Sequence, residues 1–355
     1  MAKRRRLPEE MGIFGVLVLV ALVMSMLSPE FMTLGNIQVL MLNGTVVAFL
    51  ALGQTFVLLT GGIDLSVGSN IALTGMLAAI SMQLGAPWWL AGIVAVVVGL
   101  LVGLFNGAII HFVKLPPFIV TFSTYGISAA IPQILTGARS VTVADPMFAV
   151  FGRGSLYGIP IPVIMLAIAA AVFIVILRQT PSGVHIYAVG GNADASRLAG
   201  VNIGRKILMV YAISGICAGI GGVITTSRLM VGYPTAGSGN EQFYSIASAV
   251  VGGVSLFGGI GTIVGALLGA ILIATVSNGM NVVGVDSFWQ PLVIGVIILL
   301  GVSLDAMRRR ITLAEGLRRL FAPAAAPPPL APEGAAGPSP SLDSPGVTRG
   351  EQHNR

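Results

Sequence analysis

The chain has 355 residues, of which 55% are hydrophobic and only 9% are charged, and its formal net charge is +6. Ordinary soluble domains carry about 25% charged residues, so this chain has too little polar surface to cover a globule in water. The composition excludes a soluble protein, and the single cysteine, Cys217, excludes an intrachain disulfide.

Apolar segments dominate the chain from residue 11 onward. About 20 apolar residues are needed for a helix to cross a bilayer, and segments of about this length recur without any Lys, Arg, Asp or Glu. We therefore expect an all-α integral membrane protein with about ten transmembrane helices. In chain order the expected spans are Met11–Leu27, Ile37–Leu59, Leu65–Leu84, Pro87–Ile110, Phe118–Thr136, Pro160–Leu177, Ile207–Ser227, Gln242–Phe257, Ile260–Gly284 and Phe288–Leu304.

The positions of the cations predict the orientation, because lysine and arginine accumulate in cytoplasmic loops. With both termini cytoplasmic, twelve cations lie inside and three lie outside, leaving aside the C-terminal tail. The inside set is Lys3, Arg4–Arg6, Lys114, Arg178, Arg197, Arg205, Lys206 and Arg308–Arg310, and the outside set is Arg139, Arg153 and Arg228.

The same reading divides the chain into three parts. Residues 1–10 form a basic cytoplasmic N-terminus, and residues 11–310 form the transmembrane domain. Residues 321–355 are rich in alanine and proline and lack the residues for a core, so we expect a disordered C-terminal tail.

The segment G-G-I-D-L-S-V-G-S at residues 61–69 contains Asp64, the only acid between Glu30 and Asp145. A carboxylate costs roughly 2.5–3.5 kcal/mol at the centre of a membrane helix. The topology places this turn at the cytoplasmic edge, where that cost largely disappears. Asp64 is then either the cap of the helix that follows or part of a cytoplasmic gate or ATPase contact.

A second glycine turn, G-G-V-S-L-F-G-G at residues 252–259, repeats this pattern 191 residues later. Ser255 stands where the first copy has Asp64, so the glycine turn is shared and the charge is not. The echo is consistent with an internal repeat, as transporters often have. The candidate residues of this cytoplasmic turn or gate are Gly61, Gly62, Asp64, Ser66, Gly252, Gly253 and Ser255.

The cytoplasmic loop at residues 178–206 carries a short helix signal. Asn192 suits an N-cap, Asp194 suits a first helical turn and Gly200 suits a left-handed stop. A helix of fewer than two turns is marginal alone, so flanking structure or a partner protein must hold it. An ordinary surface helix and a docking element both remain open on this evidence.

Motifs for energy conversion and catalysis are missing from the sequence. None of the three lysines lies in a G-x-x-x-x-G-K-(S/T) phosphate-binding loop, so the chain cannot hydrolyse ATP by that route. There is also no H-E-x-x-H and no membrane-buried acid pair. We expect a transport subunit rather than an enzyme, with a passive channel or gradient-driven carrier for a small neutral solute as the alternative.

Several motifs together resemble the ribose-type (monosaccharide) permease subunits of ATP-binding cassette importers. These are the 61–69 segment, L-P-P-F-I-V-T at residues 115–121, Y-A-V-G-G-N at residues 187–192, R-L-A-G-V at residues 197–201 and A-V-V-G-G-V-S-L-F-G-G-I-G at residues 249–261. The likeness covers about residues 34–310. It implies a subunit of the bacterial inner membrane that forms the pathway for a ribose-like pentose, a hexose or a related polyol.

The resemblance also implies the partners. A cytoplasmic ATPase would bind ATP, so that no cofactor resides in this chain, a periplasmic sugar-binding protein would deliver the sugar, and the permease would be a homodimer. In this family the loop before the seventh span docks into the ATPase. Residues 194–200 partly match its E-A-A-x-x-x-G signature, and the coupling candidates are Gly190, Gly191, Asn192, Asp194, Ala195, Arg197 and Gly200.

A neutral polyol requires uncharged hydrogen-bonding groups along its route. Hydrogen bonding between helices is the ordinary role of such groups in lipid, so each candidate has two interpretations. The candidate pathway residues are Asn43, Gln54, Asn106, Thr121, Ser123, Thr124, Asn278 and Asn281.

Overall fold

The structure is a computed structural model that describes residues 9–143 and 145–320. Most of the predicted basic N-terminus and the whole predicted tail at 321–355 lie outside the described residues. Contacts divide the chain into two units, Met1–Arg309 and Arg310–Arg355. The first unit contains all the features discussed below.

Each of the ten expected spans contains a helix. Seven helices are long and apolar enough to cross a membrane in the described part of the chain, namely α1, α2, α4, α5, α7, α10 and α12. The ten helices are α1 (Glu9–Leu27), α2 (Leu34–Leu59), α3 (Val67–Gln83), α4 (Trp88–Ala108), α5 (Pro117–Thr136), α7 (Ile161–Gln179), α10 (Ile203–Leu229), α11 (Glu241–Val251), α12 (Ile263–Val283) and α13 (Trp289–Leu320).

Two of the expected spans are shorter than predicted. α3 has 17 residues, and α11 has only 11 because it ends at Val251 instead of continuing to Phe257. In both cases the neighbouring glycine turn takes up residues that hydropathy alone assigns to a helix. Hydropathy detects that a segment is apolar, whereas the glycines decide where the helix ends.

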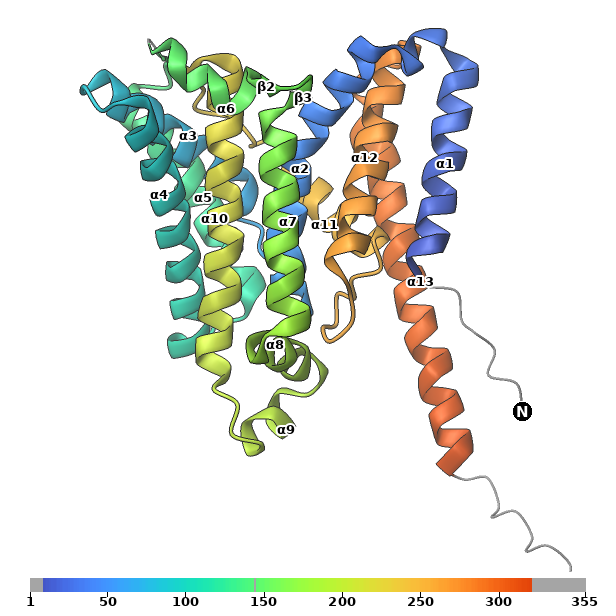
Figure 1. The fold of residues 1–355 in the computed structure, drawn as a ribbon. Coiled ribbons are helices and arrows are strands. Elements are labelled where there is room, and N and C mark those ends of the chain that lie inside the picture. The colour runs from blue at the N-terminus through green and yellow to red at the C-terminus, as the bar shows by residue number, and fades with distance from the viewer. Residues whose placement is uncertain (1–8, 144, 321–355) are drawn as a thin grey trace, which may run out of the picture. The chain divides into compact units, whose positions relative to one another are not determined.

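Short elements occupy the two ends of the helical bundle. They are η1 (Pro29–Met32), the π-helical turn η2 (Ile109–Val113), η3 (Pro146–Ala149), α6 (Val150–Arg153), α8 (Pro181–Gly191), α9 (Ala193–Leu198) and four two-residue strands, β1 (Val141–Thr142), β2 (Ser155–Leu156), β3 (Ile159–Pro160) and β4 (Val231–Gly232). β1 pairs with β4, and β2 pairs with β3, both in antiparallel register. In Figure 1 the strands and α6 lie at one end of the bundle, the hairpin end, and α8 and α9 lie at the other, the α8–α9 end.

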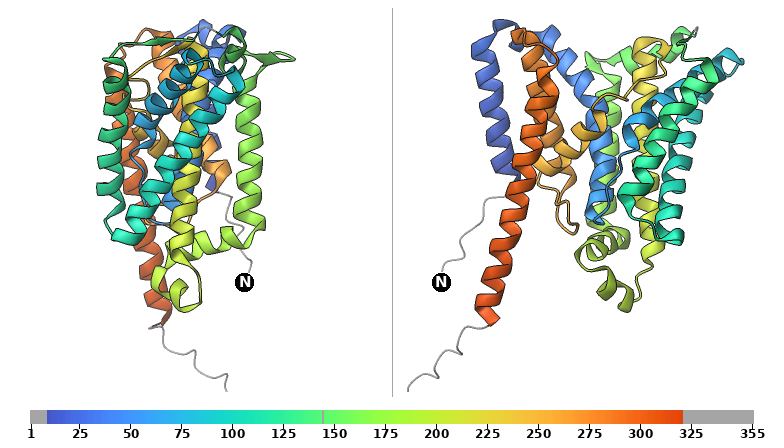
Figure 2. Two further views of the ribbon diagram at one scale, coloured as in Figure 1. Left: turned by 90° about the vertical axis from the view of Figure 1, so that its left-hand side faces the viewer. Right: turned by 180° about the vertical axis from the view of Figure 1, so that it is seen from behind.

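Small residues allow α4 and α10 to approach closely. A Cβ atom on Gly99 would overlap the carbonyl oxygen of Gly215, and one on Gly103 would overlap that of Tyr211. The four-residue spacing places both glycines on one face of α4, as expected for tightly packed membrane helices. The two helices lie side by side in both views of Figure 2.

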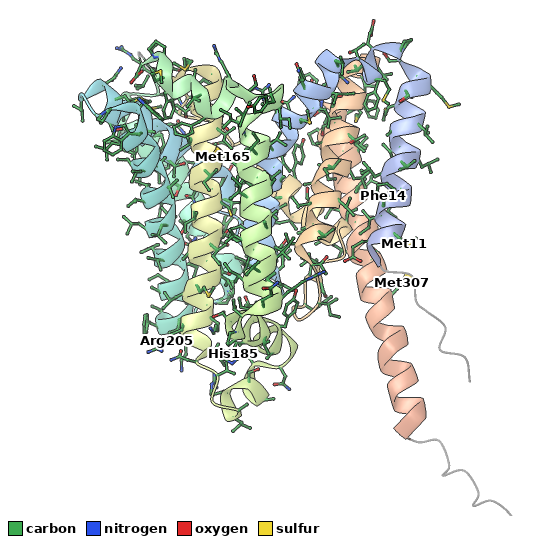
Figure 3. The ribbon with its side chains drawn as sticks, in the orientation of Figure 1. Met11, Phe14, Met165, His185, Arg205 and Met307 are labelled. Atoms are coloured by element: carbon green, nitrogen blue, oxygen red, sulfur yellow. The ribbon has the colours of Figure 1, made fainter. Side chains whose placement is uncertain are left out.

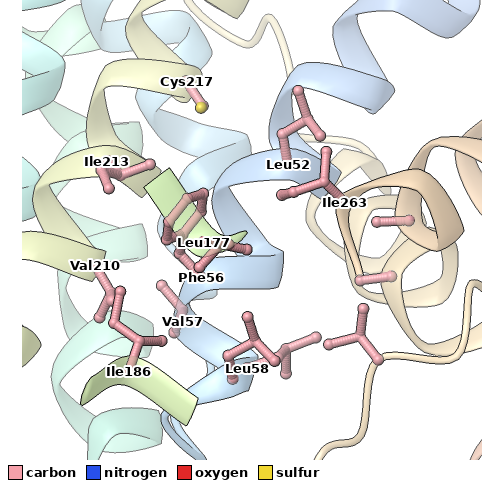
Figure 4. Close-up of a cluster of buried hydrophobic side chains, with 14 of the residues drawn as sticks. Leu52, Phe56, Val57, Leu58, Leu177, Ile186, Val210, Ile213, Cys217 and Ile263 are labelled. Carbon is pink, nitrogen blue, oxygen red and sulfur yellow. The ribbon is translucent and has the colours of Figure 1, made fainter. Parts of the chain in front are cut away.

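The largest hydrophobic cluster lies towards the α8–α9 end and joins α2, α7, α8, α10 and α12. Figure 4 shows Phe56, Leu177, Ile186 and Val210 from four of these helices in contact. The ring of Phe56 also meets Phe173 edge to face, with centroids 5.1 Å apart. The short α8 is therefore part of the core rather than a surface appendage.

Outward-facing side chains on the long helices are apolar. Met11 and Phe14 of α1, labelled in Figure 3, are both more than half exposed. His185 and Arg205 lie at the α8–α9 end in the same view. This distribution matches helices surrounded by lipid, with polar groups gathered beyond the apolar band.

Candidate functional site

The loop between α7 and α10 forms two helices, where the sequence indicated one. α8 begins where the Thr180 hydroxyl accepts a hydrogen bond from the N–H of Gly183 at 3.3 Å. The side chains of Ile186 and Val189 are 0% and 4% exposed. These two apolar contacts fix α8 to the bundle.

α9 forms where the sequence placed a short helix. Oδ1 of Asn192 accepts a hydrogen bond from the N–H of Ala195 at 2.9 Å, so Asn192 is the N-cap. Gly200 has a φ of +82°, the left-handed conformation that favours glycine after a helix. α8 supplies the flanking structure that so short a helix requires.

The outer face of α9 combines charges with one apolar side chain. Asp194 and Arg197 form an ion pair at 3.6 Å and both remain largely exposed. Leu198, at the end of α9, is 91% exposed. An apolar side chain rimmed by charges at a protruding point is typical of a protein–protein contact.

Gly190 is where α8 touches the end of α2 and the second of the two glycine turns. We call residues 61–66 the first turn and residues 252–262 the second turn. A Cβ atom on Gly190 would overlap the Leu59 carbonyl oxygen and the backbone nitrogen of Gly259, so only glycine permits this approach. The N–H of Gly259 also donates to the Leu59 carbonyl oxygen at 2.9 Å. The end of α2, the second turn and α8 therefore meet at one point.

Tyr187 provides a second connection between α8 and the second turn. Its hydroxyl donates to the carbonyl oxygen of Gly261 at 2.8 Å. Burial raises the pKa of Tyr187 despite the opposing charge of Arg178, so the hydroxyl keeps the proton that it donates. Gly261 itself precedes α12 and has a φ of +146°, so it belongs to the turn and not to a helix-packing face.

Asp64 is completely buried within the helical bundle. Its Oδ1 accepts hydrogen bonds from the N–H and the hydroxyl of Ser66 at 2.9 and 2.6 Å. Its Oδ2 accepts from the hydroxyl of Ser214 at 2.8 Å. Ser214 lies eleven residues after Ile203, where α10 begins, so at 1.5 Å per residue Asp64 sits roughly 16 Å along that helix.

The local role of Asp64 also differs from a simple helix cap. The N-cap of α3 is Ser66, whose side chain makes no capping bond. Asp64 instead accepts the backbone N–H of Ser66 two residues along the chain, as in an Asx turn, and thereby holds the residue that starts α3. The first turn returns into the bundle after α2 ends, and hydrogen bonds compensate the buried carboxylate.

Four expected pathway residues belong to the network around Asp64. The amide of Asn106 donates to the Ser66 hydroxyl at 3.0 Å, and the hydroxyl of Thr124 donates to Oδ1 of Asn106 at 2.6 Å. Thr121 donates to the carbonyl oxygen of Ile63 at 3.1 Å. The fourth, Gln54, pairs its side-chain amide with the backbone N–H and C=O of Asp64. These side chains form hydrogen bonds that join different segments of the chain, which is the ordinary role of uncharged polar groups in lipid.

Three other expected pathway residues line a common cavity. Asn43, Asn278 and Asn281 lie on α2 and α12 around a space of about 290 Å³ towards the hairpin end. Arg228 of α10 and Glu241 of α11 line the same space. The last candidate, Ser123, is on α5 and donates to the Ile119 carbonyl oxygen at 2.8 Å, away from both groups.

The sequence missed several members of these sites. Ser214 and Tyr211 lie within an apolar span, where nothing marks one residue as facing a turn 150 positions away. Arg228 and Glu241 did carry a signal, since both are charged residues directly at the ends of apolar segments. Arg228 contributed only to the predicted orientation, and Glu241 was not among the selected candidates.

The bundle of apolar helices, its neutral polar interior and its protruding helical loop define a membrane transport subunit. The chain belongs to the family described as branched-chain amino acid transport system / permease component, whose profile matches residues 36–302. It is therefore a multi-pass permease of the bacterial inner membrane, not an enzyme.

Curated relatives match over most of their length. The D-allose transport system permease protein AlsC of Escherichia coli is 38% identical over 84% of this chain and 92% of its own. The ribose import permease protein RbsC of Haemophilus influenzae is 39% identical over 85% of this chain and 94% of its own. The RbsC protein of Bacillus subtilis is 39% identical over 84% and 92% of the two chains. No solved structure matches the chain.

Proposed function

We propose that this chain forms the translocation pathway for a neutral monosaccharide in an ATP-binding cassette importer. The relatives are named for ribose and allose, and a further relative, XylH of Haemophilus influenzae, is named for xylose at 31% identity. A pentose, a hexose or a related polyol therefore remains open as the cargo. ATP is bound by a separate ATPase subunit, and this chain holds no cofactor.

The observation that carries this proposal is the construction of the loop between α7 and α10. Its outer part, α9, exposes Leu198 beside the ion pair of Asp194 and Arg197. Its inner part, α8, contacts the end of α2 and the second glycine turn through Gly190. An ATPase docked on α9 could thus displace α8 and the turns together. The proposed coupling residues are Gly190, Gly191, Asn192, Asp194, Ala195, Arg197 and Gly200.

The two turns supply the proposed gate on the same side. Gly258 lies against the backbones of both Gly190 and Gly61, so the turns share one contact region. Movement of α8 reaches α3 through the first turn and α12 through the second. The proposed gate residues are Gly61, Gly62, Asp64, Ser66, Gly252, Gly253 and Ser255.

The remaining partners follow from this orientation. The α8–α9 end faces the cytoplasm, and the hairpin end faces the periplasmic sugar-binding protein. Two copies of the permease form a homodimer, each bound by an ATPase subunit.

Docking can be tested with one exposed leucine at each end of the bundle. Leu198→Asp places a charge in the proposed contact and is expected to weaken ATPase binding at least tenfold in a detergent pull-down. Leu84→Asp is the matched control, because Leu84 is 84% exposed and follows α3 at the hairpin end. Equal ATPase binding by both variants would contradict docking on α9. Uptake into vesicles without ATP or ATPase would instead indicate a passive channel or a gradient-driven carrier.

A further inference from the structure

The cavity at the hairpin end is lined by charged and amide side chains in an otherwise apolar bundle. Its volume is about 290 Å³, and it lies between α2, α10, α11, α12 and the start of α13. Pockets for small ligands begin at about 300 Å³, so the space suits one sugar ring and not an oligosaccharide.

Two buried side-chain oxygen atoms of residues that line this cavity have no protein partner within the described residues. They are Oε2 of Glu241 and Oγ of Ser277, and both atoms are buried. A buried polar atom without a partner costs about 1–3 kcal/mol. Solvent or a bound molecule must therefore supply hydrogen bonds at these positions when the cavity is filled.

The charged groups of the cavity are not neutralised by each other. Arg228 donates to Oδ1 of Asn43, and the one ion pair within the described residues is that of Asp194 and Arg197. The cavity consequently presents a carboxylate and a guanidinium separately. Separate charges of both signs disfavour an anionic or a cationic ligand and leave donors and acceptors for a neutral one.

Side-chain amides and a tyrosine complete the lining. The amide of Gln290 donates to Oδ1 of Asn281 at 2.7 Å, which leaves the N–H groups of Asn281 to donate elsewhere. Asn278 exchanges two hydrogen bonds with Asn36, at 2.9 and 3.0 Å, and is held in place by them. Tyr244 adds an aromatic side chain to the wall. Carboxylate, guanidinium, amide and aromatic groups around a small space are the chemistry that recognises a polyhydroxyl ring.

We propose that this cavity is a low-affinity station for a single neutral monosaccharide on its way through the permease, with Glu241, Ser277, Asn281 and Arg228 as its hydrogen-bonding groups. The inference rests on the proposed sugar import and adds to it the position of a transient sugar-binding site. Each sugar hydroxyl both donates and accepts, so one ring can satisfy the unpartnered acceptors and the free donors together. Low affinity is required, because a pathway site must release what it binds.

Ser277→Ala separates a station from a structural role. Removing a hydroxyl without a protein partner should leave stability unchanged or raise it, so a structural role predicts no loss of transport. A station predicts sugar uptake slowed about fivefold. Glu241→Gln, of equal size, should slow uptake at least tenfold, whereas Glu30→Gln in η1, where the glutamate is exposed, is the matched control and should have no effect.

The measurement uses the importer reconstituted in proteoliposomes with its ATPase and binding protein. Uptake of labelled D-ribose, D-allose and D-xylose is recorded together with ATP hydrolysis stimulated by the loaded binding protein. The station predicts slowed uptake, retained hydrolysis and a changed ratio between the three sugars. Wild-type uptake and ratios in both variants would overturn it, as would a parallel loss of uptake and hydrolysis. Failure of the proposed function itself would appear separately, as absent stimulation in the wild-type importer.

Discussion

The two glycine turns have similar sequences but are held in different ways. In the first turn Asp64 accepts three hydrogen bonds from side chains and backbone, and α3 begins directly afterwards at Val67. In the second turn the hydroxyl of Ser255 accepts the N–H of Phe257 at 3.3 Å, and α12 begins only at Ile263. The side chains of Asp64 and Ser255 each accept a hydrogen bond from the N–H two residues further along the chain, so the two turns share this local hydrogen bond.

Because the two turns are anchored differently, we expect them to have different roles in the gate. The first turn is anchored within the bundle by a network that reaches α4, α5 and α10. The second turn contains four glycines with positive φ, at 253, 258, 259 and 261, and is contacted by α8. Motion of α8 should therefore displace the second turn further than the first, which the network around Asp64 holds in the bundle.

The largest expected effect comes from closing the space at Gly190. In Gly190→Ala the new Cβ would meet backbone atoms of Leu59 and Gly259, which cannot move aside as a side chain can. We expect ATP-driven sugar uptake to fall at least tenfold in proteoliposomes. Gly126→Ala in α5 is the control, because a Cβ there meets nothing within 4 Å. Equal uptake by the two variants would remove Gly190 from the coupling contact.

Replacing the polar residue of each turn should affect stability unequally. Asp64→Ala leaves three buried donors unpaired and is expected to lower the free energy of unfolding by about 3 kcal/mol or more. Ser255→Ala should lower it by about 1 kcal/mol. Denaturant unfolding of the purified permease in detergent measures both values. Similar losses in the two variants would mean that the turns are anchored alike.

The variant Asp64→Asn separates the effect of the negative charge of Asp64 from the effect of the hydrogen bonds by which Asp64 holds the first turn. The amide keeps an acceptor oxygen but loses the charge, so we expect a modest loss of stability and retained sugar-stimulated ATP hydrolysis. A variant that assembles normally yet loses stimulated hydrolysis would make Asp64 part of the moving gate.

A smaller effect is expected at Tyr187. Tyr187→Phe removes the hydrogen bond to Gly261 but retains the ring, which should weaken the hold of α8 on the second turn by about 1 kcal/mol. Uptake should fall a few-fold while ATPase binding in the pull-down stays unchanged. Reduced ATPase binding would instead place Tyr187 in the docking surface.

The sequence predicted the segments better than their depth in the bundle. Apolar runs located all ten helices, and the spacing of Asn192, Asp194 and Gly200 located α9, because both signals are local. The burial of Asp64 depends on Ser214, 150 residues away, and no local pattern reports that pairing. The same holds for the cavity, where Asn43 and Asn278 were selected singly but Arg228 joined them only through the packing of α10.

The central claim is that α8 drives the second turn, and a reversible cross-link tests it most directly. A Cβ at position 259 would lie 3.1 Å from the Cα of Gly191, so cysteines introduced by Gly191→Cys and Gly259→Cys lie close enough for a short bifunctional methanethiosulfonate cross-linker, whose disulfide links dithiothreitol cleaves. Native Cys217 is buried and does not interfere. We predict that the double variant transports sugar before cross-linking, stops when cross-linked and recovers with dithiothreitol. Undiminished ATP-driven uptake by the fully cross-linked permease would contradict the account.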